Sequence, residues 1–249
     1  MKFYDVTRTL VPTPLRKVLR RRYYERTQTL RDALSNVANE IRLSRTSAKA
    51  ANKFKELRGQ GELKLHLGCG SHLKSGWVNI DMSRSAPLSQ MNGTRFIAYD
   101  LRMGLPLDDL SASMIYSSHL FEHLEYKHSV RLLKDCYRVL RPGGVFRISL
   151  PDFKKSFEAY VRSDATHFDL LNLGELLPEV EPGTETLVDH INFGVYQHGE
   201  HKCIYDEEKI MTLLRHVGYV SVARSSFDPE IDPDDPVRRR HSFYVEAVK

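Results

Sequence analysis

From residue 63 onward, short apolar segments alternate with turns and helical stretches. We expect a helix at about 128–140 and strands at 63–67, 77–81, 95–100, 114–118 and 145–150. This alternation is typical of a parallel α/β sheet, because parallel strands need crossover connections. The run Arg141-Pro142-Gly143-Gly144 should end the helix, since proline cannot continue it and glycine permits the turn.

The C-terminal part of the chain predicts the edge of this sheet. A helix should run from about 207 to 217, with Asp206 as its N-cap. Two closing strands, at about 219–226 and 242–248, flank an acidic, proline-rich loop at 228–236. That loop is long enough for the two strands to pair as a hairpin. We therefore predict an α/β fold with seven strands in a mostly parallel sheet and an antiparallel edge.

Three features stand at predicted strand ends. The turn Gly68-Cys69-Gly70 follows the first strand, and glycine lets the backbone approach a ligand whose carboxylate nearby amides can receive. Asp81 closes the second strand, where it can accept both hydroxyls of a ribose. Asp100 closes the third, where it can accept a hydrogen bond from an adenine amino group. Ligands of open α/β sheets bind beyond the carboxyl ends of the strands, so these features predict a binding site.

The connection between the first two predicted strands is unusually short. It has only nine residues, 68–76, whereas a crossover normally takes about a dozen and includes a helix. We expect the helix to shrink to about one turn. Asp81 lies 11 residues beyond Gly70, but a dinucleotide dehydrogenase has a full helix and an acid about 20 residues on. The spacing therefore argues against that class of enzyme.

Four segments carry a resemblance to a known family. They are Leu65-His66-Leu67-Gly68-Cys69-Gly70, Gly76-Trp77-Val78-Asn79-Ile80-Asp81, Ser117-Ser118-His119-Leu120-Phe121-Glu122-His123 and Arg141-Pro142-Gly143-Gly144. Over about residues 63–152 the chain resembles the class I S-adenosylmethionine-dependent methyltransferases, whose fold is Rossmann-like. It departs from them at His72, which replaces the usual third glycine of the turn.

The resemblance implies S-adenosylmethionine as the cofactor. Gly68 and Gly70 would contact its methionine end, Asp81 its ribose and Asp100 its adenine. The predicted cofactor-binding residues are Gly68, Cys69, Gly70, Asp81, Asp100, Leu101, Ser117 and Ser118.

The segment after the fourth strand should border the acceptor. An oxygen acceptor usually needs a base, and we predict His119 for the acceptor site, with Glu122 and His123 fixing the loop. These residues also spell H-x-x-E-H, which on a helix would place two zinc ligands on one face. The surrounding α/β pattern favours the methyltransferase, and we expect no metal site.

Residues 164–203 should be irregular and form an insertion or lid. A polar cluster lies in and just after this segment: His190, Asn192, His198, Glu200, His201 and Tyr205. It could cap the site and present a base, bind a metal, or form a structural hydrogen-bond network. The resemblance continues loosely through 201–206. We therefore predict His201 and Tyr205, with His119, as catalytic candidates.

The N-terminal quarter differs in charge from the rest. Residues 1–60 hold 15 Lys and Arg against 5 Asp and Glu, and the remainder holds 22 against 27. We predict a basic helical arm at 1–60 and a methyltransferase domain at 61–249. Residues 13–58 should be helical, with one apolar face made by Leu30, Leu34, Val37 and Ile41. The arm could pack on the domain, bind anionic lipid or another polyanion, or self-associate.

The chain has no apolar run near the roughly 20 residues of a membrane span and no secretion signal at its start. Three scattered cysteines make no disulfide framework. We expect a cytoplasmic protein, or one held peripherally at a membrane. The predicted activity is methyl transfer to an oxygen or nitrogen of a small molecule, sugar or cell-surface glycan intermediate. The alternatives are a nucleic-acid methyltransferase that uses the arm and a methyltransferase-fold binding protein without turnover.

Overall fold

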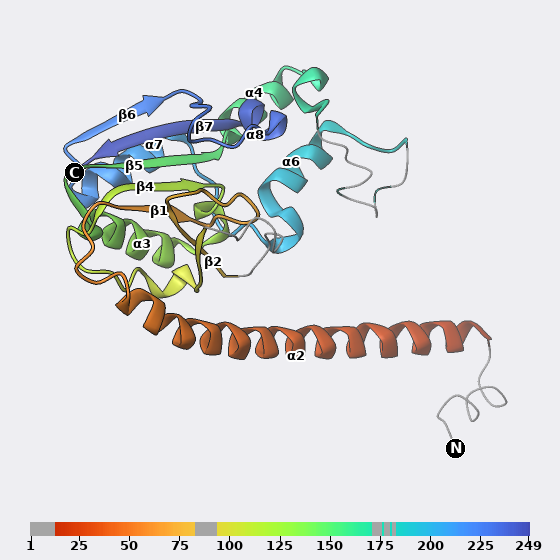
Figure 1. Cartoon of the computed structure of the whole chain (residues 1–249). Helices are drawn as coiled ribbons and strands as arrows, with labels where there is room; N and C mark the ends of the chain where they lie inside the picture. The colour runs from red at the N-terminus through yellow and green to blue at the C-terminus, as the bar shows by residue number, and fades with distance from the viewer. Residues whose placement is uncertain (1–12, 83–93, 171–175, 177–179, 181–182) are drawn as a thin grey trace. The chain divides into compact units, whose positions relative to one another are not determined.

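A computed structural model describes residues 13–82, 94–170, 176, 180 and 183–249, with side chains from residue 30 onward. Contacts divide the chain into two units, Met1–Thr46 and Ser47–Lys249. The long helix α2 (Thr13–Lys55) crosses the division, so its last turns belong to the second unit (Figure 1).

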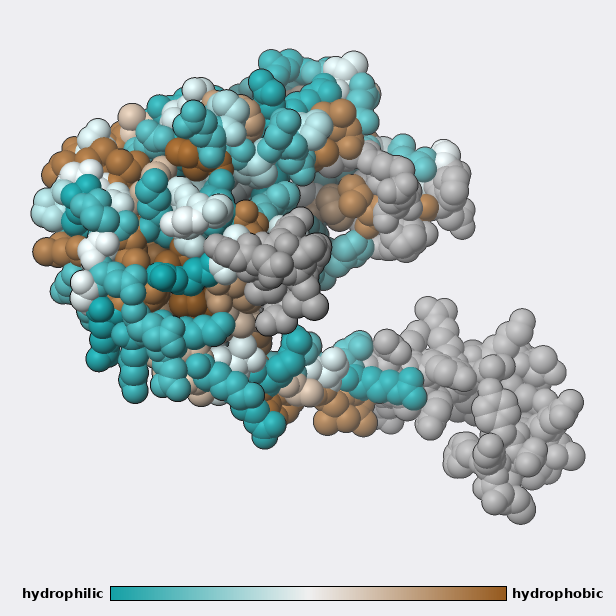
Figure 2. Space-filling model, in the orientation of Figure 1, coloured by the Kyte–Doolittle hydropathy of each residue, from teal (hydrophilic) through white to brown (hydrophobic). Residues whose placement is uncertain are grey.

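In the first unit, α2 presents apolar side chains among charged ones. Leu30, Leu34, Val37 and Ile41 are exposed, by 49% to 60%. Figure 2 shows hydrophobic patches between hydrophilic ones along this stretch of the helix. The basic side chains predicted between residues 13 and 29 lie outside the described side chains. Within the described residues, no helix is both long and apolar enough to cross a membrane.

The second unit is built on one sheet of seven strands in the order β3-β2-β1-β4-β5-β7-β6. The first five strands are parallel to one another, and β7 pairs antiparallel with both β5 and β6, which gives the antiparallel edge that the sequence predicted. Their bounds are β1 Leu63–Leu67, β2 Val78–Asp81, β3 Arg95–Ala98, β4 Ala112–Ser118, β5 Leu140–Pro151, β6 Ser221–Ser225 and β7 Ser242–Val248. The order reverses between β1 and β4, which makes their carboxyl ends the place for a ligand.

The helices of this unit are α3 Tyr126–Val139, α4 Phe153–Val161, α6 Leu187–Tyr196, α7 Glu207–Val217 and α8 Pro236–His241. The described residues also hold four short 3-10 helices, η2 Leu101–Met103, η3 Phe121–His123, η4 Ala165–Phe168 and η5 Gln197–Gly199. The predicted bounds of α7 are confirmed, because Asp206 caps its start and Gly218 its end.

Two local predictions were wrong. Residues 68–77 form turns and contain no helix, because ten residues are too few for a crossover helix. Residues 164–203 are not all irregular, since α6 lies among them, and part of that range is outside the described residues. The predicted end of the helix before 141–144 is confirmed, since α3 ends at Val139 and Gly143 has a φ of +73°. The four residues of this turn bulge out of β5, where Ala112 pairs with Leu140 and Met114 with Val145.

The two faces of the sheet differ in chemistry. On one face Leu65 and Ile115 are fully buried, in one cluster with Leu133 of α3 and Leu214 of α7. Helices α3 and α7 also contact each other (Figure 1). The other face carries neighbouring polar side chains at His66, Asn79, Tyr116, Ser118, Arg147 and Ser149, all buried. The turns after β1 and the loop before α8 contact this polar face, and Arg147 and Lys74 tie that loop to it.

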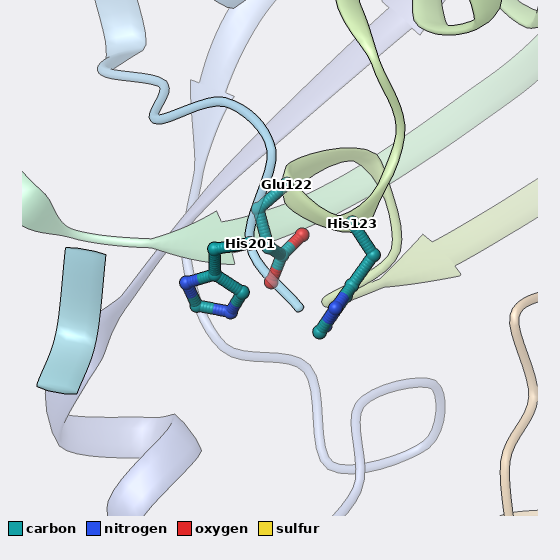
Figure 3. A group of neighbouring side chains, drawn as sticks. All are labelled: Glu122, His123 and His201. Atoms are coloured by element: carbon teal, nitrogen blue, oxygen red, sulfur yellow. The ribbon is translucent and has the colours of Figure 1, made fainter. Parts of the chain in front are cut away.

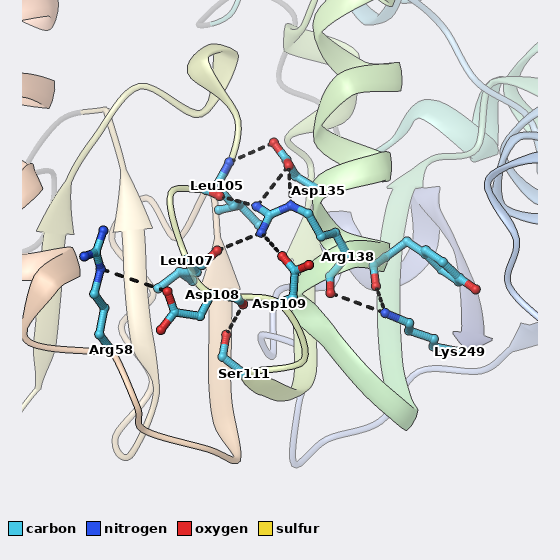
Figure 4. A network of polar contacts seen from close by, with 10 residues as sticks. Arg58, Leu105, Leu107, Asp108, Asp109, Ser111, Asp135, Arg138 and Lys249 are labelled. Atoms are coloured by element: carbon cyan, nitrogen blue, oxygen red, sulfur yellow. Dashed lines mark hydrogen bonds and ion pairs between the residues drawn. The ribbon is translucent and has the colours of Figure 1, made fainter.

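At the start of β4, Arg138 fixes the connection that follows β3. Its guanidinium donates hydrogen bonds to the carbonyls of Leu105 and Leu107, at 2.6 and 2.7 Å, and pairs with Asp109 and Asp135 (Figure 4). One side chain at the end of α3 thus satisfies two backbone groups that have no strand partner. These contacts anchor the connection between β3 and β4 to the end of α3.

Candidate functional site

The glycine turn is held by its own backbone. Gly68 and Gly70 have φ of +65° and +50°, values that favour glycine. The amides of Gly68 and Cys69 donate to Ile80 O at 2.9 and 3.3 Å, and that of Gly70 donates to Asp81 Oδ2 at 2.9 Å. We predicted that amides of this turn bind a ligand carboxylate. In the structure these amides already donate hydrogen bonds to β2.

The two glycines serve different purposes. A Cβ on Gly68 would lie 2.9 Å from Cβ of Leu120, so this glycine permits close packing against the segment after β4. A Cβ on Gly70 would have no atom within 4 Å. The backbone is therefore open to an approaching molecule at Gly70, beside the Asp81 carboxylate.

The predicted adenine ligand Asp100 lies just beyond β3 and is buried. Its carboxylate pairs with the Arg102 guanidinium at 2.7 Å and caps η2 by accepting from the Arg102 amide. Its amide donates to Ser47 Oγ of α2. Leu101, also predicted for the cofactor, is 2% exposed and belongs to the core. These contacts fix the loop, and an adenine amino group would share the carboxylate with Arg102.

A cavity of about 360 Å³, called the cleft below, opens at the carboxyl ends of β1 and β4. Gly68, Cys69 and Ser118 of the predicted cofactor set line it. Ser117 points to the opposite, apolar face, where its hydroxyl is buried without a hydrogen-bond partner. Burial raises the pKa of the Cys69 thiol to about 12, so the thiol stays protonated and unreactive.

Sequence reasoning missed the cations of the cleft. Arg238, from α8, reaches Ser118 Oγ at 3.4 Å, and its charge acts on His72 and His119. Lys74 lies 5.0 Å above the Tyr116 ring. No signal marks Arg238 among the three consecutive arginines 238–240. For Lys74, the short connection before β2 was a hint that we did not use. A connection made of turns, without a helix, leaves polar side chains over the sheet.

His119 begins a second polar group at the same sheet end. It has φ of +52°, and its Nε2 lies 2.8 Å from Ser242 Oγ. Burial, aided by the charge of Arg238, lowers the pKa of His119 to about 3. The imidazole is therefore neutral at physiological pH and a weak proton acceptor. Because it precedes η3 with a left-handed backbone, His119 shares no helix face with His123, and the zinc-peptidase arrangement is absent here.

Glu122 and His123 meet His201 (Figure 3). Potential ligand atoms of the three residues all lie within 4.8 Å of one another. The Glu122 side chain is fully buried, and burial raises the pKa of its carboxyl to about 8. The imidazole rings of His123 and His201 stand edge to face with centroids 4.8 Å apart. The structure thus brings His119 and His201, both predicted as catalytic, to either side of the same carboxyl group.

The other residues of the predicted polar cluster do not lie together. His190 stacks on Phe168, and His198 Nε2 lies 2.8 Å from the Leu176 carbonyl. Tyr205 is 3% exposed and part of the core, and burial raises the pKa of its hydroxyl to about 12. It contributes to the wall of a second cavity, of about 570 Å³, between α4 and the start of α7. Of this cluster, His201 joins the group around Glu122, and the charge of Glu200 acts on His123.

Comparison with known proteins identifies the region that carries these features. Residues 65–148 match the methyltransferase domain family. A probable S-adenosylmethionine-dependent methyltransferase of Mycolicibacterium smegmatis is 39% identical over 105 residues. That alignment covers 38% of this chain and 40% of the relative, so the likeness spans about two fifths of the relative's length.

Solved structures with a similar chain path have low sequence identity. One is a SAM-dependent methyltransferase from Archaeoglobus fulgidus, with TM-score 0.47 and 15% identity over 85% of this chain and 94% of that one. Another is a Haemonchus contortus phosphoethanolamine N-methyltransferase in complex with S-adenosyl-L-methionine, with TM-score 0.46 and 13% identity over 81% and 52%.

Proposed function

We propose that this chain, which contains a class I S-adenosylmethionine-dependent methyltransferase domain, transfers a methyl group to an oxygen or nitrogen atom of a small-molecule or glycan acceptor. The observation that carries the proposal is the meeting of three features at one sheet end. They are the open backbone at Gly70, the Asp81 carboxylate beside it, and a cleft with two cations.

The cofactor would lie at this end of the sheet, with different residues contacting its ribose, its methionine end and its adenine. Asp81 would accept the ribose hydroxyls, since it closes β2 next to Gly70. Arg238 and Lys74 would receive the methionine carboxylate, because the amides of the turn already donate to β2. The adenine would lie toward Asp100 and Leu101, beyond β3.

S-adenosylmethionine supplies a methyl group that its sulfonium already activates. The protein then has mainly to align the acceptor and to accept its proton. His119, neutral because of its lowered pKa, has a nitrogen for this purpose, although a pKa of about 3 makes it a weak base. Of the other two catalytic candidates, His201 lies beside Glu122 near this end of the sheet, whereas Tyr205 is buried in the hydrophobic core.

A sugar or cell-surface glycan intermediate is the acceptor class that we propose. The lining of the cleft supports it, because His66 and His72 offer polar groups to a hydroxyl-rich molecule beside the two cations that would hold the cofactor. The basic, partly apolar helix α2 would suit docking at an anionic membrane surface where such intermediates are assembled.

Titration with S-adenosylhomocysteine tests the cofactor site. Wild-type protein should bind it, and Asp81→Ala should weaken binding by about tenfold or more, since hydrogen bonds to a charged group contribute about 1.5–3 kcal/mol. Asp109→Ala, an exposed carboxylate paired with Arg138, is the matched control and should bind normally. Absence of binding by the wild type would refute the proposal.

Transfer of labelled methyl from S-adenosylmethionine to nucleotide sugars, glycolipids and RNA then separates the acceptor classes. The excess of basic residues in 1–60 favours RNA or DNA as the second candidate. Binding to RNA that weakens steeply with salt, and is lost with residues 1–46, would support that candidate. Cofactor binding without transfer to any acceptor would instead indicate a binding protein that has kept the fold.

A further inference from the structure

We propose that Glu122, His123 and His201 form a binding site for one divalent transition-metal ion of the zinc or ferrous-iron type. The three side chains come from two distant parts of the chain, and their potential ligand atoms lie within 4.8 Å of one another (Figure 3). Two imidazoles and a carboxylate are a ligand set that proteins use for zinc and for non-haem iron. The inference revises the expectation of no metal and does not depend on methyl transfer.

Glu122 is the strongest single argument. Its side chain has no solvent exposure, and both carboxyl oxygens are buried without a hydrogen-bond partner. His119 Nδ1 lies 3.3 Å from Oε1, but the contact does not have hydrogen-bond geometry. A buried carboxylate is costly unless a proton, a cation or hydrogen bonds compensate its charge. A metal ion between Glu122 and the two imidazoles would supply that compensation.

His201 is already oriented as a ligand. Its Nδ1 lies 2.6 Å from the carbonyl oxygen of Gly194 and must carry the proton to donate to it. The other ring nitrogen, Nε2, is therefore left with its lone pair. Histidines that bind metals commonly donate their second nitrogen to a backbone carbonyl in this way, which fixes both tautomer and ring orientation.

The backbone holds the two parts of the site together. The amides of Lys202 and Cys203 both donate to the Glu122 carbonyl, at 2.7 and 3.2 Å. The amide of His201 donates to the Tyr196 carbonyl at 3.3 Å. The segment that carries His201 is thus fixed against η3 without the ion, so binding would need side-chain adjustment rather than folding of a loop.

The charges around the site are mixed. Against the effect of burial, the positive charge of Arg238 lowers the pKa of Glu122. At His123, burial and the charges of Arg238 and Lys202 lower the pKa of the imidazole, and the Glu200 carboxylate raises it. Three protein ligands leave at least one position of a zinc or iron ion for water or another oxygen ligand. The site would therefore have an open coordination position, unlike a structural zinc site with four protein ligands.

Metal titration of the full-length protein tests the inference directly. Protein stripped with a chelator is titrated calorimetrically with zinc, ferrous iron (anaerobically) and magnesium. We expect about one zinc or iron ion per chain, with magnesium much weaker, because imidazole ligands favour transition metals. Bound zinc should also raise the thermal unfolding midpoint, since it binds only the folded state.

Variants locate the site. Glu122→Gln, His123→Ala and His201→Ala should each weaken binding by more than about tenfold. His190→Ala, His198→Ala and Cys203→Ser, which change other possible ligands outside the cluster, should leave it unchanged. Glu122→Gln preserves size, and S-adenosylhomocysteine binding and circular dichroism report whether each variant folds. Failure of wild-type protein to bind any of these ions, or binding that survives all three cluster substitutions, would overturn the inference. Cofactor binding is scored separately, so either result stands by itself.

Discussion

Arg147 and Asp232 form an ion pair whose side chains are each 1% exposed. Arg147 stands on the polar face of β5, and Asp232 comes from the loop between β6 and α8. The guanidinium also donates to Ser225 Oγ and to the Ser226 carbonyl, at 2.9 and 2.6 Å. One buried cation therefore holds down the loop that leads to Arg238 in the cleft.

Asp232→Ala should lower the free energy of unfolding by up to about 3–5 kcal/mol, because the buried guanidinium then keeps only the partly exposed Glu246 as a counter-ion. The same change should weaken S-adenosylhomocysteine binding, since the loop before Arg238 loses its anchor. Glu246→Gln is the control, because Glu246 also pairs with Arg147 but its side chain is 40% exposed. It should cost about 1 kcal/mol or less. Urea denaturation measures both, and equal losses would contradict the buried pair as the anchor.

The two glycines of the turn should respond differently to substitution. Gly70→Ala should cost about 1–2 kcal/mol, the penalty of a left-handed backbone for alanine. Gly68→Ala has the same penalty and adds a clash with Leu120, which should cost about 1–3 kcal/mol more.

A double-mutant cycle separates the two contributions. In a Leu120→Ala background, the cost of Gly68→Ala should fall toward that of Gly70→Ala, as measured by urea denaturation. An unchanged cost would show that packing against Leu120 is not the reason for glycine at 68.

The parts of the fold that could be predicted are those with local signals. Helix α7 was predicted with its bounds because Asp206 and Gly218 mark its ends in the sequence. β1 was predicted because an apolar run stops at glycine. Helix α6 had such a signal as well, since Thr186 and Asp189 form a capping box, but the polar composition around it obscured the pattern.

Of the site, only the residues that directly follow or end a strand could be predicted from the sequence. Gly70 and Asp81 are adjacent because β1 and β2 pair in parallel, which the motif order implied. Glu122 and His201 meet through backbone contacts between distant segments, and no spacing in the sequence encodes that meeting. Likewise, Arg238 reaches the cleft only because of how the loop folds over the polar face.

Arg238→Ala should weaken S-adenosylhomocysteine binding by about tenfold to a hundredfold, because it removes a charge-assisted hydrogen bond to the proposed carboxylate. Arg238→Lys should retain part of the affinity. Arg239→Ala is the matched control on the same helix, since its guanidinium lies over the Phe227 ring, 4.6 Å from the centroid. Calorimetry compares the three variants. Equal affinity of Arg238→Ala and wild type would place the methionine carboxylate elsewhere.

His66 should make the protein sensitive to acid. Burial, with a further contribution from Lys74, lowers the pKa of this imidazole from 6.5 to about 3 in the folded protein. Between these values the unfolded chain binds a proton that the folded chain does not, so stability falls as the pH drops below 6.5. From pH 7 to pH 5 this one residue should remove about 2 kcal/mol, at about 1.4 kcal/mol per pH unit below 6.5.

Urea denaturation of His66→Gln at both pH values measures that contribution. The variant should lose about 2 kcal/mol less than the wild type between pH 7 and pH 5, whatever its stability at pH 7. His216→Gln, a substitution of an exposed histidine on α7, should leave the difference as it is in the wild type. A pH dependence that His66→Gln does not reduce would mean that the buried imidazole at the cleft accepts a proton in the folded protein.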